Sequence, residues 1–479
     1  MKIYRKINPS NGEFLYEVEI FDKEKVKKEV EIAKTGFEEW SNLPLNKRVS
    51  VLKNVLKILK KRKEDFINVV REDAGKVRQD AIVEVLTTVN HLHYLTRKGY
   101  KFLKRERRSS GYFKNNSCYV QFKPWGVVAI ISPWNYPLIL TATPLFHALL
   151  AGNSVVLKPS EITTKVSLLL KELCIDAGIP DNVFRVVTGD GSTGRELVES
   201  DIDMVCFTGS TQVGVEIAKK CSERLIPYIL ELGGKDNAIV FKDADVERAA
   251  AGIVWGGISN GGQTCIGVEN VLVEADIYED FLEMLKQEIE KIPKENLGAV
   301  INSIQFEKIE YHIKDAIEKG ARLICGGERL DKFRFQPTIL ADITPDMKVF
   351  YEETFGPVLG VMRFKNEEEL IKLANSLDYG LNGSVWTGDL KKASLIASKL
   401  DTGSLCINDC LTNYLITDLP FGGVKKSGIG RVHGVEGVRA FAKMQSVMIH
   451  KFGLKKELWW YPYKEKVQNL FLKLIDMLF

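Results

Sequence analysis

After Tyr119 the chain alternates short runs rich in valine and isoleucine with helical segments, and this alternation constrains the fold more than any other feature. The runs read GVVAIIS, SVVLKP, FRVVT, MVCFT and NAIVF. Strands that alternate with helices of about ten to fifteen residues form parallel sheets with helical crossovers. We therefore predict an α/β fold with a doubly wound parallel sheet in this part of the chain.

A second alternating series runs from about 270 to 425 and contains the runs NVLVEA, ARLICGG, GSVWTGD and GSLCIND. The 479 residues also exceed the length at which one hydrophobic core keeps growing. Residues 24–108 show helical spacing of apolar residues. We predict two doubly wound domains, one formed by 1–105 and 125–233 and the other by 234–425, with the boundary at Gly233-Gly234.

Charge and cysteine usage exclude several classes of protein. The 67 basic and 63 acidic residues leave a net charge of only +4, and the two signs are mixed along the chain, so nucleic acid is not an expected partner. The N-terminus lacks the apolar segment of a secretory signal. The eight cysteines are too sparse and irregular for a disulfide scaffold. These features predict a cytoplasmic protein.

The segment NGGQTC at 260–265 presents Cys265 in a glycine-rich loop after a predicted helix. A thiolate is a strong nucleophile for a carbonyl carbon, and a helix end or backbone N–H groups could lower its pKa. An isolated cysteine is more often a small core residue. The other motifs decide between these two interpretations.

The segment ELGGK at 231–235 places Glu231 at the end of an apolar strand. A half-buried carboxylate there would have a raised pKa and could act as a general base toward water. The alternative is a glutamate that faces solvent at a strand end.

The segment SPWNYP at 132–137 presents Trp134 and Asn135 at the end of the strand GVVAII. Ligands bind at the carboxyl ends of strands in open α/β sheets. The Asn135 amide could donate a hydrogen bond to an oxyanion, a contribution of about 3 kcal/mol in comparable sites. The alternative is a turn residue that caps the following helix.

Two further segments suit a dinucleotide. FTGSTQVG at 207–214 places the N–H groups of Ser210 and Thr211 at the start of a helix, a position that favours phosphate. The strand SVVLKPSE ends in Lys158 and Glu161, which suit ribose hydroxyls. Because Glu161 would repel a 2′-phosphate, the segment favours NAD, with NADP as the alternative.

Three other patterns carry less weight. GDGSTG at 189–194 matches G-x-G-x-x-G literally, but the acidic residue expected about 20 residues later is missing, so we predict an ordinary connection. His91 and His93 would point to different faces of a helix. Cys406 and Cys410 have no second cysteine pair. We predict no metal site.

Seven motifs together resemble the aldehyde dehydrogenase superfamily over about residues 5–450. They are SPWNYP, LKPSE, FTGSTQVG, ELGGK, NGGQTC, EETFGPV at 352–358 and LPFGGVKKSGIGR at 419–431. The resemblance implies a cofactor domain, a catalytic domain and a small β oligomerisation arm formed by 106–124 and 440–450. It also implies a homodimer or homotetramer.

Carried over residue by residue, the resemblance implies that Cys265 is the nucleophile, Asn135 an oxyanion donor and Glu231 the base for deacylation. Glu353 and Phe355 would hold the nicotinamide ribose and ring. The residues implied for the adenine and pyrophosphate sites are Trp134, Lys158, Glu161, Gly209, Ser210 and Gly214.

The tail at 451–479 continues beyond the family's usual end and resembles the class 3 and fatty-aldehyde branch. Its last segment keeps helical spacing of Val467, Leu470, Phe471, Leu474, Ile475, Leu478 and Phe479. This amphipathic helix is too short to cross a bilayer. It either docks on its own or a neighbouring subunit, or makes peripheral contact with a membrane.

The sequence therefore predicts oxidation of an apolar aliphatic or aromatic aldehyde to a carboxylic acid, with NAD as oxidant and a cysteine thioester as intermediate. One alternative is a CoA-acylating relative, which would have no use for the hydrolytic base Glu231. The other is a non-catalytic protein that retains the fold.

Overall fold

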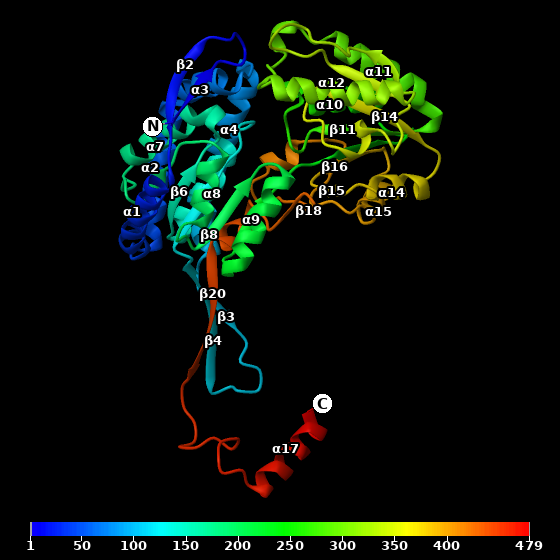
Figure 1. Cartoon of the computed structure of the whole chain (residues 1–479). Helices are drawn as coiled ribbons and strands as arrows, with labels where there is room; N and C mark the ends of the chain where they lie inside the picture. Colours follow the sequence, from blue (N-terminus) through cyan, green and yellow to red (C-terminus); the bar gives the residue numbers. More distant parts are fainter. Residues whose placement is uncertain (1, 479) are drawn as a thin grey trace.

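The computed structural model describes residues 2–478, which form two α/β lobes, an extended arm and a C-terminal tail (Figure 1). Each lobe contains one large sheet, which confirms the predicted α/β fold class. The arm descends from the lobes and leads into the tail at the bottom of Figure 1. The predicted domain boundaries remain a prediction.

The first sheet has the strand order β19-β9-β8-β5-β6-β7. All neighbouring pairs are parallel except β19 with β9. The strands are β5 (Val127–Ile131), β6 (Ser154–Lys158), β7 (Phe184–Val186), β8 (Met204–Thr208), β9 (Tyr228–Glu231) and β19 (Gly428–Ile429). The chain thus returns to this sheet after completing the second one.

Helices cover both faces of the first sheet, which explains why its strands read as continuous apolar runs. Val127 and Ala129 of β5 pack with α1, α8 and α9, whereas Val128 and Ile130 pack with α2, α4, α6 and α7. The helices are α1 (Lys23–Ser41), α2 (Leu45–Lys61), α3 (Lys63–Ala74), α4 (Arg78–Tyr94), α6 (Ile139–Ala151), α7 (Thr164–Asp176), α8 (Gly191–Glu199) and α9 (Thr211–Arg224).

The second sheet has the order β12-β13-β14-β11-β10-β16-β17 and is parallel except at β12. Its strands are β10 (Asp236–Val240), β11 (Val268–Glu274), β12 (Arg322–Cys325), β13 (Thr338–Ala341), β14 (Val358–Phe364), β16 (Gly383–Trp386) and β17 (Cys406–Ile407). The run NAIVF, which we placed in the first series, forms β10 within this sheet. Periodicity alone cannot assign a buried strand to one of two parallel sheets.

Helices also pack on both sides of the second sheet. One hydrophobic cluster includes α10 and α11, and the other includes α12, α14 and α15. The helices are α10 (Val246–Ile258), α11 (Tyr278–Glu290), α12 (Ser303–Glu318), α13 (Lys348–Tyr351), α14 (Glu367–Asn375) and α15 (Leu390–Ala397). Between the sheets, β15 (Tyr379–Gly380) pairs with β18 (Val424–Lys425).

The arm is a three-stranded antiparallel sheet, as predicted for 106–124 and 440–450. Its strands are β3 (Glu106–Arg108), β4 (Asn116–Pro124) and β20 (Ala442–His450), in the order β20-β4-β3. The short α5 (Tyr100–Phe102) precedes the arm, and α16 (Gly434–Ala440) leads into β20. The N-terminal hairpin of β1 (Lys2–Ile7) and β2 (Phe14–Ile20) was not predicted.

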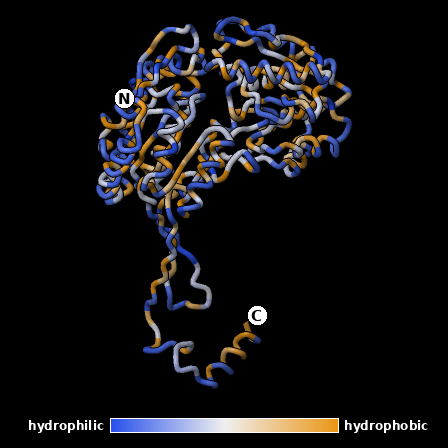
Figure 2. The backbone as a smooth tube through the Cα atoms, viewed as in Figure 1, coloured by the Kyte–Doolittle hydropathy of each residue, from blue (hydrophilic) through white to orange (hydrophobic). Residues whose placement is uncertain are grey.

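The tail ends in α17 (Glu465–Leu478), which lies away from both lobes (Figure 1). Apolar and polar residues alternate along it (Figure 2), and none of its described side chains is buried. Phe479, the last residue of the predicted apolar face, lies outside the described residues. Among residues 2–478, no helix is long and apolar enough to span a bilayer.

Candidate active site

The carboxyl ends of β5, β8 and β9 meet at one edge of the first sheet, where open α/β sheets bind their ligands. β5 leads into the segment that carries Trp134 and Asn135, β8 leads into Gly209 and Ser210, and β9 ends at Glu231. The loop with Cys265 reaches this edge from the second lobe. The structure thus brings together residues that are more than a hundred positions apart in the sequence.

The loop before Cys265 has an unusual backbone. Asn260, Gly261 and Gly262 have φ values of 55°, 64° and 71°, in the left-handed region that favours glycine. A Cβ at Gly262 would lie 2.2 Å from the carbonyl carbon of Gly356, so glycine is required there by close packing. Gln263 fixes the loop further, because its side chain donates to Ala299 O (2.9 Å) and accepts from the Ile301 N–H (2.9 Å).

Asn135 is buried and directly linked to this loop. Its side-chain Nδ2 donates to the backbone carbonyl of Gln263 at 3.1 Å. Its backbone carbonyl accepts a 3.2 Å hydrogen bond from Asn260 Nδ2. A side-chain amide has two N–H donors. One therefore holds the loop, and the second is available to a ligand oxygen beside Cys265.

Cys265 lies where three cavities meet. The first, about 230 Å³ in volume, extends from Cys265 between α4 and α10. The second, about 220 Å³, contains Trp134, Asn135, Glu231, Glu353 and Phe355. The third is small, about 20 Å³, and its lining includes Cys265, Glu231 and Tyr414. A thiol in this position can be approached from two sides.

The first cavity is lined largely by apolar and aromatic side chains. Within residues 2–478, the charged residues that line it are Asp80 and Glu84, and both accept backbone N–H hydrogen bonds. Among the described residues, neither lysine nor arginine lines it. The lining residues are Gln79, Asp80, Val83, Glu84, Thr87, Tyr136, Ile139, Leu140, Trp255, Ser259, Thr264, Cys265, Ile266, Leu411, Tyr414 and Leu415.

Burial dominates the electrostatics of the site. It raises the pKa of the Cys265 thiol, and the carboxyls of Glu353, Asp236 and Glu231 raise it further. The sequence left open that a helix end or backbone N–H groups lower this pKa, but burial outweighs the one such group that lowers it, the Ile266 N–H. Burial also raises the pKa of Glu231 well above its usual range, although Arg431 opposes the shift. Neither Glu231 carboxylate oxygen has a hydrogen-bond partner among the described residues.

A buried ion pair of Lys235 with Glu269 fixes the backbone of the segment that carries Glu353 and Phe355. The Glu269 carboxylate accepts the N–H groups of Thr354 (2.7 Å) and Phe355 (2.8 Å), and Phe355 has a positive φ of 57°. The Gly234 N–H donates to Glu353 Oε1 at 3.1 Å. Burial, followed by the Glu269 charge, raises the pKa of Glu353 to about 7.

A larger cavity of about 940 Å³ continues from Trp134 along the first sheet. Lys158 and Glu161 form a 3.2 Å ion pair in its wall, and Ser210 caps the N-terminus of α9 there. Gly209 also lines this cavity. Gly214 instead is buried in α9, where the helix packs closely on Leu232. A Cβ at Gly214 would lie 2.4 Å from Leu232 Cδ2.

The structure adds cavity-lining residues from a segment that the sequence analysis treated as an ordinary connection. The GDGSTG segment forms the start of α8, and Gly191, Gly194 and Arg195 line the large cavity opposite Lys158. His91 is buried and His93 exposed, as their spacing predicted. Within residues 2–478, no three or more histidine, cysteine or acidic side chains are arranged to hold a metal ion.

The fold and the site define an α/β protein with a long cavity that leads from helix α9 to one cysteine. The model of the aldehyde dehydrogenase family matches residues 1–447, and the chain belongs to this family. The predicted resemblance is therefore confirmed. The match ends before the tail, so the resemblance of the tail to the fatty-aldehyde branch remains a prediction.

Individual relatives are similar over nearly the whole chain. A 4,4'-diapolycopene aldehyde oxidase of a Methylomonas species is 39% identical over 448 residues, 92% of this chain and 84% of the relative. The NADP-dependent succinate-semialdehyde dehydrogenase of Escherichia coli K12 is 33% identical, covering 92% and 93%. A Mycobacterium tuberculosis aldehyde dehydrogenase solved with NAD⁺ superposes with a TM-score of 0.90 at 33% identity, covering 94% and 96%.

The buried Lys235–Glu269 pair predicts a large loss of stability in one variant. Glu269→Ala leaves the Lys235 ammonium unpaired and frees the N–H groups of Thr354 and Phe355. We expect the free energy of unfolding, measured by denaturant titration, to fall by about 3–5 kcal/mol.

The matched control is Glu279→Ala, which breaks the exposed pair of Glu279 with Arg322. Exposed pairs contribute little, so its stability should stay close to that of the parent. Equal losses in the two variants would contradict the role of burial.

Proposed function

We propose that the protein oxidises an apolar aldehyde to a carboxylic acid through a covalent intermediate on Cys265. The observation that carries the proposal is the position of Cys265, between an apolar cavity on one side and a cavity with Glu231, Glu353 and Phe355 on the other. An aldehyde would enter through the first cavity and meet the cofactor at the thiol.

In the first step the Cys265 sulfur attacks the carbonyl carbon, and a thiohemiacetal forms. The free N–H of Asn135 and the backbone N–H of Cys265 donate to the oxygen that becomes negative. A nicotinamide held by Glu353 and Phe355 would supply the oxidant for the next step, as the acceptor of the hydride that leaves this carbon. The product on the protein is then a thioester of Cys265.

In the second step Glu231 takes a proton from water, which attacks the thioester and releases the acid. The two unpartnered carboxylate oxygens of Glu231 support this role, because a buried polar group without a partner is costly unless a ligand or water meets it. A CoA-acylating enzyme would not need this base. The joint placement of Cys265, Asn135 and Glu231 argues against a non-catalytic protein.

We propose NAD as the cofactor, which the relative of known structure also binds. The large cavity fits a dinucleotide: the N-terminus of α9 suits the pyrophosphate, and Trp134, Lys158 and Glu161 suit the adenosine half. Gly209 and Ser210 would contact the phosphates, and Gly214 would let α9 pack closely. Glu353 and Phe355 would hold the nicotinamide end. Because Glu161 disfavours a 2′-phosphate, NAD should be preferred over NADP.

The substrate class follows from the lining of the first cavity. A carboxylate that entered it would find no lysine or arginine among the described lining residues, and the Asp80 carboxylate would disfavour it. A buried charge without a partner is strongly disfavoured. The cavity therefore suits an uncharged, apolar aldehyde better than succinate semialdehyde, for which several relatives are named.

The first prediction from the proposed function tests activity, substrate class and cofactor together. Absorbance at 340 nm is followed with NAD or NADP and either alkanals of two to sixteen carbons or succinate semialdehyde. We expect kcat/KM for medium and long alkanals with NAD to exceed that for succinate semialdehyde by about 100-fold or more, because desolvating an unpaired carboxylate costs several kcal/mol. Equal use of the charged aldehyde would contradict the substrate class, and a dependence on CoA would contradict hydrolysis.

The second prediction concerns Glu231. Glu231→Gln should keep a first rapid formation of one NADH per site but stall later turnover, because the amide cannot accept the proton of water. In the parent, the hydrolytic rate should rise with pH up to the raised pKa of Glu231, because only the ionised carboxylate is a base. Stopped-flow fluorescence of NADH measures both phases, and loss of the rapid phase in the variant would contradict the assignment.

The arm supports an oligomer. β20 is an edge strand of the arm, and Met444 and Met448 on it are exposed. Unpaired edge strands readily pair with another chain. We propose that the protein is a homodimer or homotetramer assembled through this arm. A cytoplasmic location remains a prediction.

We propose that the tail makes peripheral contact with an anionic lipid surface, which would bring the protein to apolar aldehydes. Residues 451–478 contain six lysines and three acidic residues, and α17 presents exposed Leu470 and Ile475 on its apolar face. The preceding Trp459, Trp460 and Tyr461 are about half exposed or more. Basic amphipathic helices flanked by aromatic residues bind at membrane interfaces.

The third prediction follows from this tail. The full-length protein should co-sediment with vesicles that contain phosphatidylglycerol more than with phosphatidylcholine vesicles, and Leu470→Ser/Ile475→Ser should abolish the difference. The control Leu225→Ser removes an exposed leucine outside the tail and should bind like the parent. If the tail packs on a second subunit instead, the double variant will lower the oligomeric mass and no vesicle binding will be seen.

A further inference from the structure

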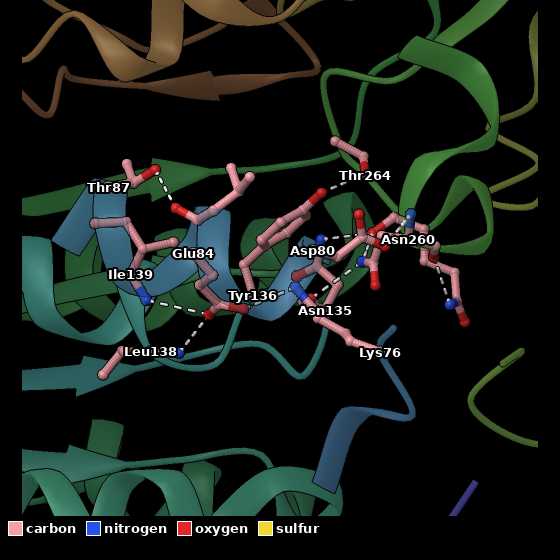
Figure 3. Close-up of polar contacts among 12 residues, drawn as sticks. Lys76, Asp80, Glu84, Thr87, Asn135, Tyr136, Leu138, Ile139, Asn260 and Thr264 are labelled. Atoms are coloured by element: carbon pink, nitrogen blue, oxygen red, sulfur yellow. Dashed lines mark hydrogen bonds and ion pairs between the residues drawn. The ribbon is translucent and has the colours of Figure 1, made fainter. Parts of the chain in front are cut away.

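A fully buried ion pair lies beside the proposed site but takes no part in the chemistry described above. Lys76 Nζ is 2.7 Å from Glu84 Oε2, and both side chains have no exposed surface (Figure 3). Such a pair contributes little net stability, because desolvation offsets the attraction between the charges. Net stability therefore does not explain why this pair is buried here, which leaves a role in the structure of the neighbouring site.

Glu84 anchors the segment that follows Asn135. Its second carboxylate oxygen, Oε1, accepts the N–H groups of Leu138 (2.7 Å) and Ile139 (3.3 Å), at the start of α6. A carboxylate at a helix N-terminus is favoured by the helix dipole. Glu84 therefore fixes α6, and with it the short turn on which Asn135 sits, relative to α4.

Lys76 connects the same pair to the nucleophile loop. Its buried ammonium lies 3.4 Å from the centre of the Tyr136 ring, a close cation–π contact. The Tyr136 hydroxyl forms a 2.9 Å hydrogen bond with the hydroxyl of Thr264, the residue before Cys265. One chain of contacts thus runs from Glu84 through Lys76 and Tyr136 to Thr264.

A second connection joins α4 to the nucleophile loop through Asp80, one helical turn before Glu84. Asp80 Oδ2 accepts the N–H of Asn260 at 3.0 Å, and Asn260 Nδ2 donates to the carbonyls of Asn135 (3.2 Å) and Gln263 (3.1 Å). In Figure 3 these side chains converge between α4 and the loop. Three residues four positions apart, Lys76, Asp80 and Glu84, thus hold the oxyanion segment and the nucleophile loop together.

We propose that Lys76 and Glu84 are positioning residues, which act through Tyr136 to hold Cys265 at a fixed distance from the Asn135 amide. The proposal rests on the proposed function, because it assigns a role in the thiol's attack on the aldehyde. The two charges satisfy each other, so they add no net charge to the substrate cavity that Glu84 and Tyr136 line. The ring of Tyr136 transmits the position of the ammonium to the loop.

The main test uses Lys76→Met/Glu84→Gln, which removes both charges but keeps similar volume and an acceptor for the Leu138 and Ile139 N–H groups. We expect the variant to fold, to bind NAD with a Kd within twofold of the parent, and to form the first NADH at least tenfold more slowly. Lys76→Arg retains the cation over the ring and should keep the rate within threefold of the parent. The matched control is Arg78→Met/Glu64→Gln, which removes an exposed pair between the start of α4 and α3 and should change nothing.

Tyr136→Phe and Thr264→Val test the link between the ring and the loop, because each removes one hydroxyl of the same hydrogen bond. Each should slow the first NADH formation by at least fivefold, and the double variant should be no slower than the single ones, since the two groups act as a unit. Multiplicative losses, or an unchanged rate in Lys76→Met/Glu84→Gln, would overturn the proposal.

Alkylation of Cys265 by iodoacetamide gives a readout that does not depend on aldehyde oxidation. A loop released from Tyr136 should expose the thiol, so peptide mass spectrometry should show at least threefold faster alkylation in the charge-free variant than in the control pair. Equal alkylation rates would also overturn the proposal. If the parent oxidises no aldehyde, the proposed function fails, while this comparison still decides the role of Lys76 and Glu84.

Discussion

The placement of loop 259–265 against the carboxyl edge of the first sheet is the constraint on which the whole site depends. The loop belongs to the second lobe, yet Gln263 and Asn260 bond to Asn135 of the first. Its left-handed backbone leaves no room for a side chain at Gly262, which packs directly on Gly356. Because the two lobes meet through backbone and amide contacts here, a shift of either lobe would separate the Cys265 thiol from the Asn135 amide.

Burial sets the resting state of the proposed chemistry. Burial and then the nearby carboxyls raise the pKa of the Cys265 thiol, and burial raises the pKa of Glu231 and that of Glu353, the latter to about 7. A protonated thiol is a weak nucleophile, which protects it when no ligand is bound. A nicotinamide ring is positively charged, so a ring held near Cys265 by Glu353 and Phe355 would favour the thiolate through electrostatic attraction. The acidic groups around Cys265 would then attract the positively charged cofactor ring, whereas in the free protein they disfavour the thiolate.

Much of the fold could be predicted because its strands are buried on both faces and separated by helices of regular length. The sequence also indicated that Cys265, Glu231, Asn135 and Glu353 would lie together, and in the structure all four line one cavity, while their roles remain a proposal. The supporting residues were not predictable. The roles of Lys76, which lies between α3 and α4, and of Glu84 on α4 are not evident until α4 is placed beside α6. The pKa of Cys265 depends on burial and on carboxyls from two segments, 231–236 and Glu353. The assignment of NAIVF to the second sheet likewise depends on tertiary pairing.

The most direct test of the central claim is the mass of the protein after it reacts with an aldehyde and NAD and is quenched with acid in the first turnover. We predict that the tryptic peptide containing Cys265 gains the mass of the acyl group, that hydroxylamine removes it, and that Cys265→Ala shows neither the adduct nor NADH formation. Hydroxylamine cleaves thioesters, so the removal identifies the bond. NADH formation by Cys265→Ala, or an acyl group on another residue, would contradict the account.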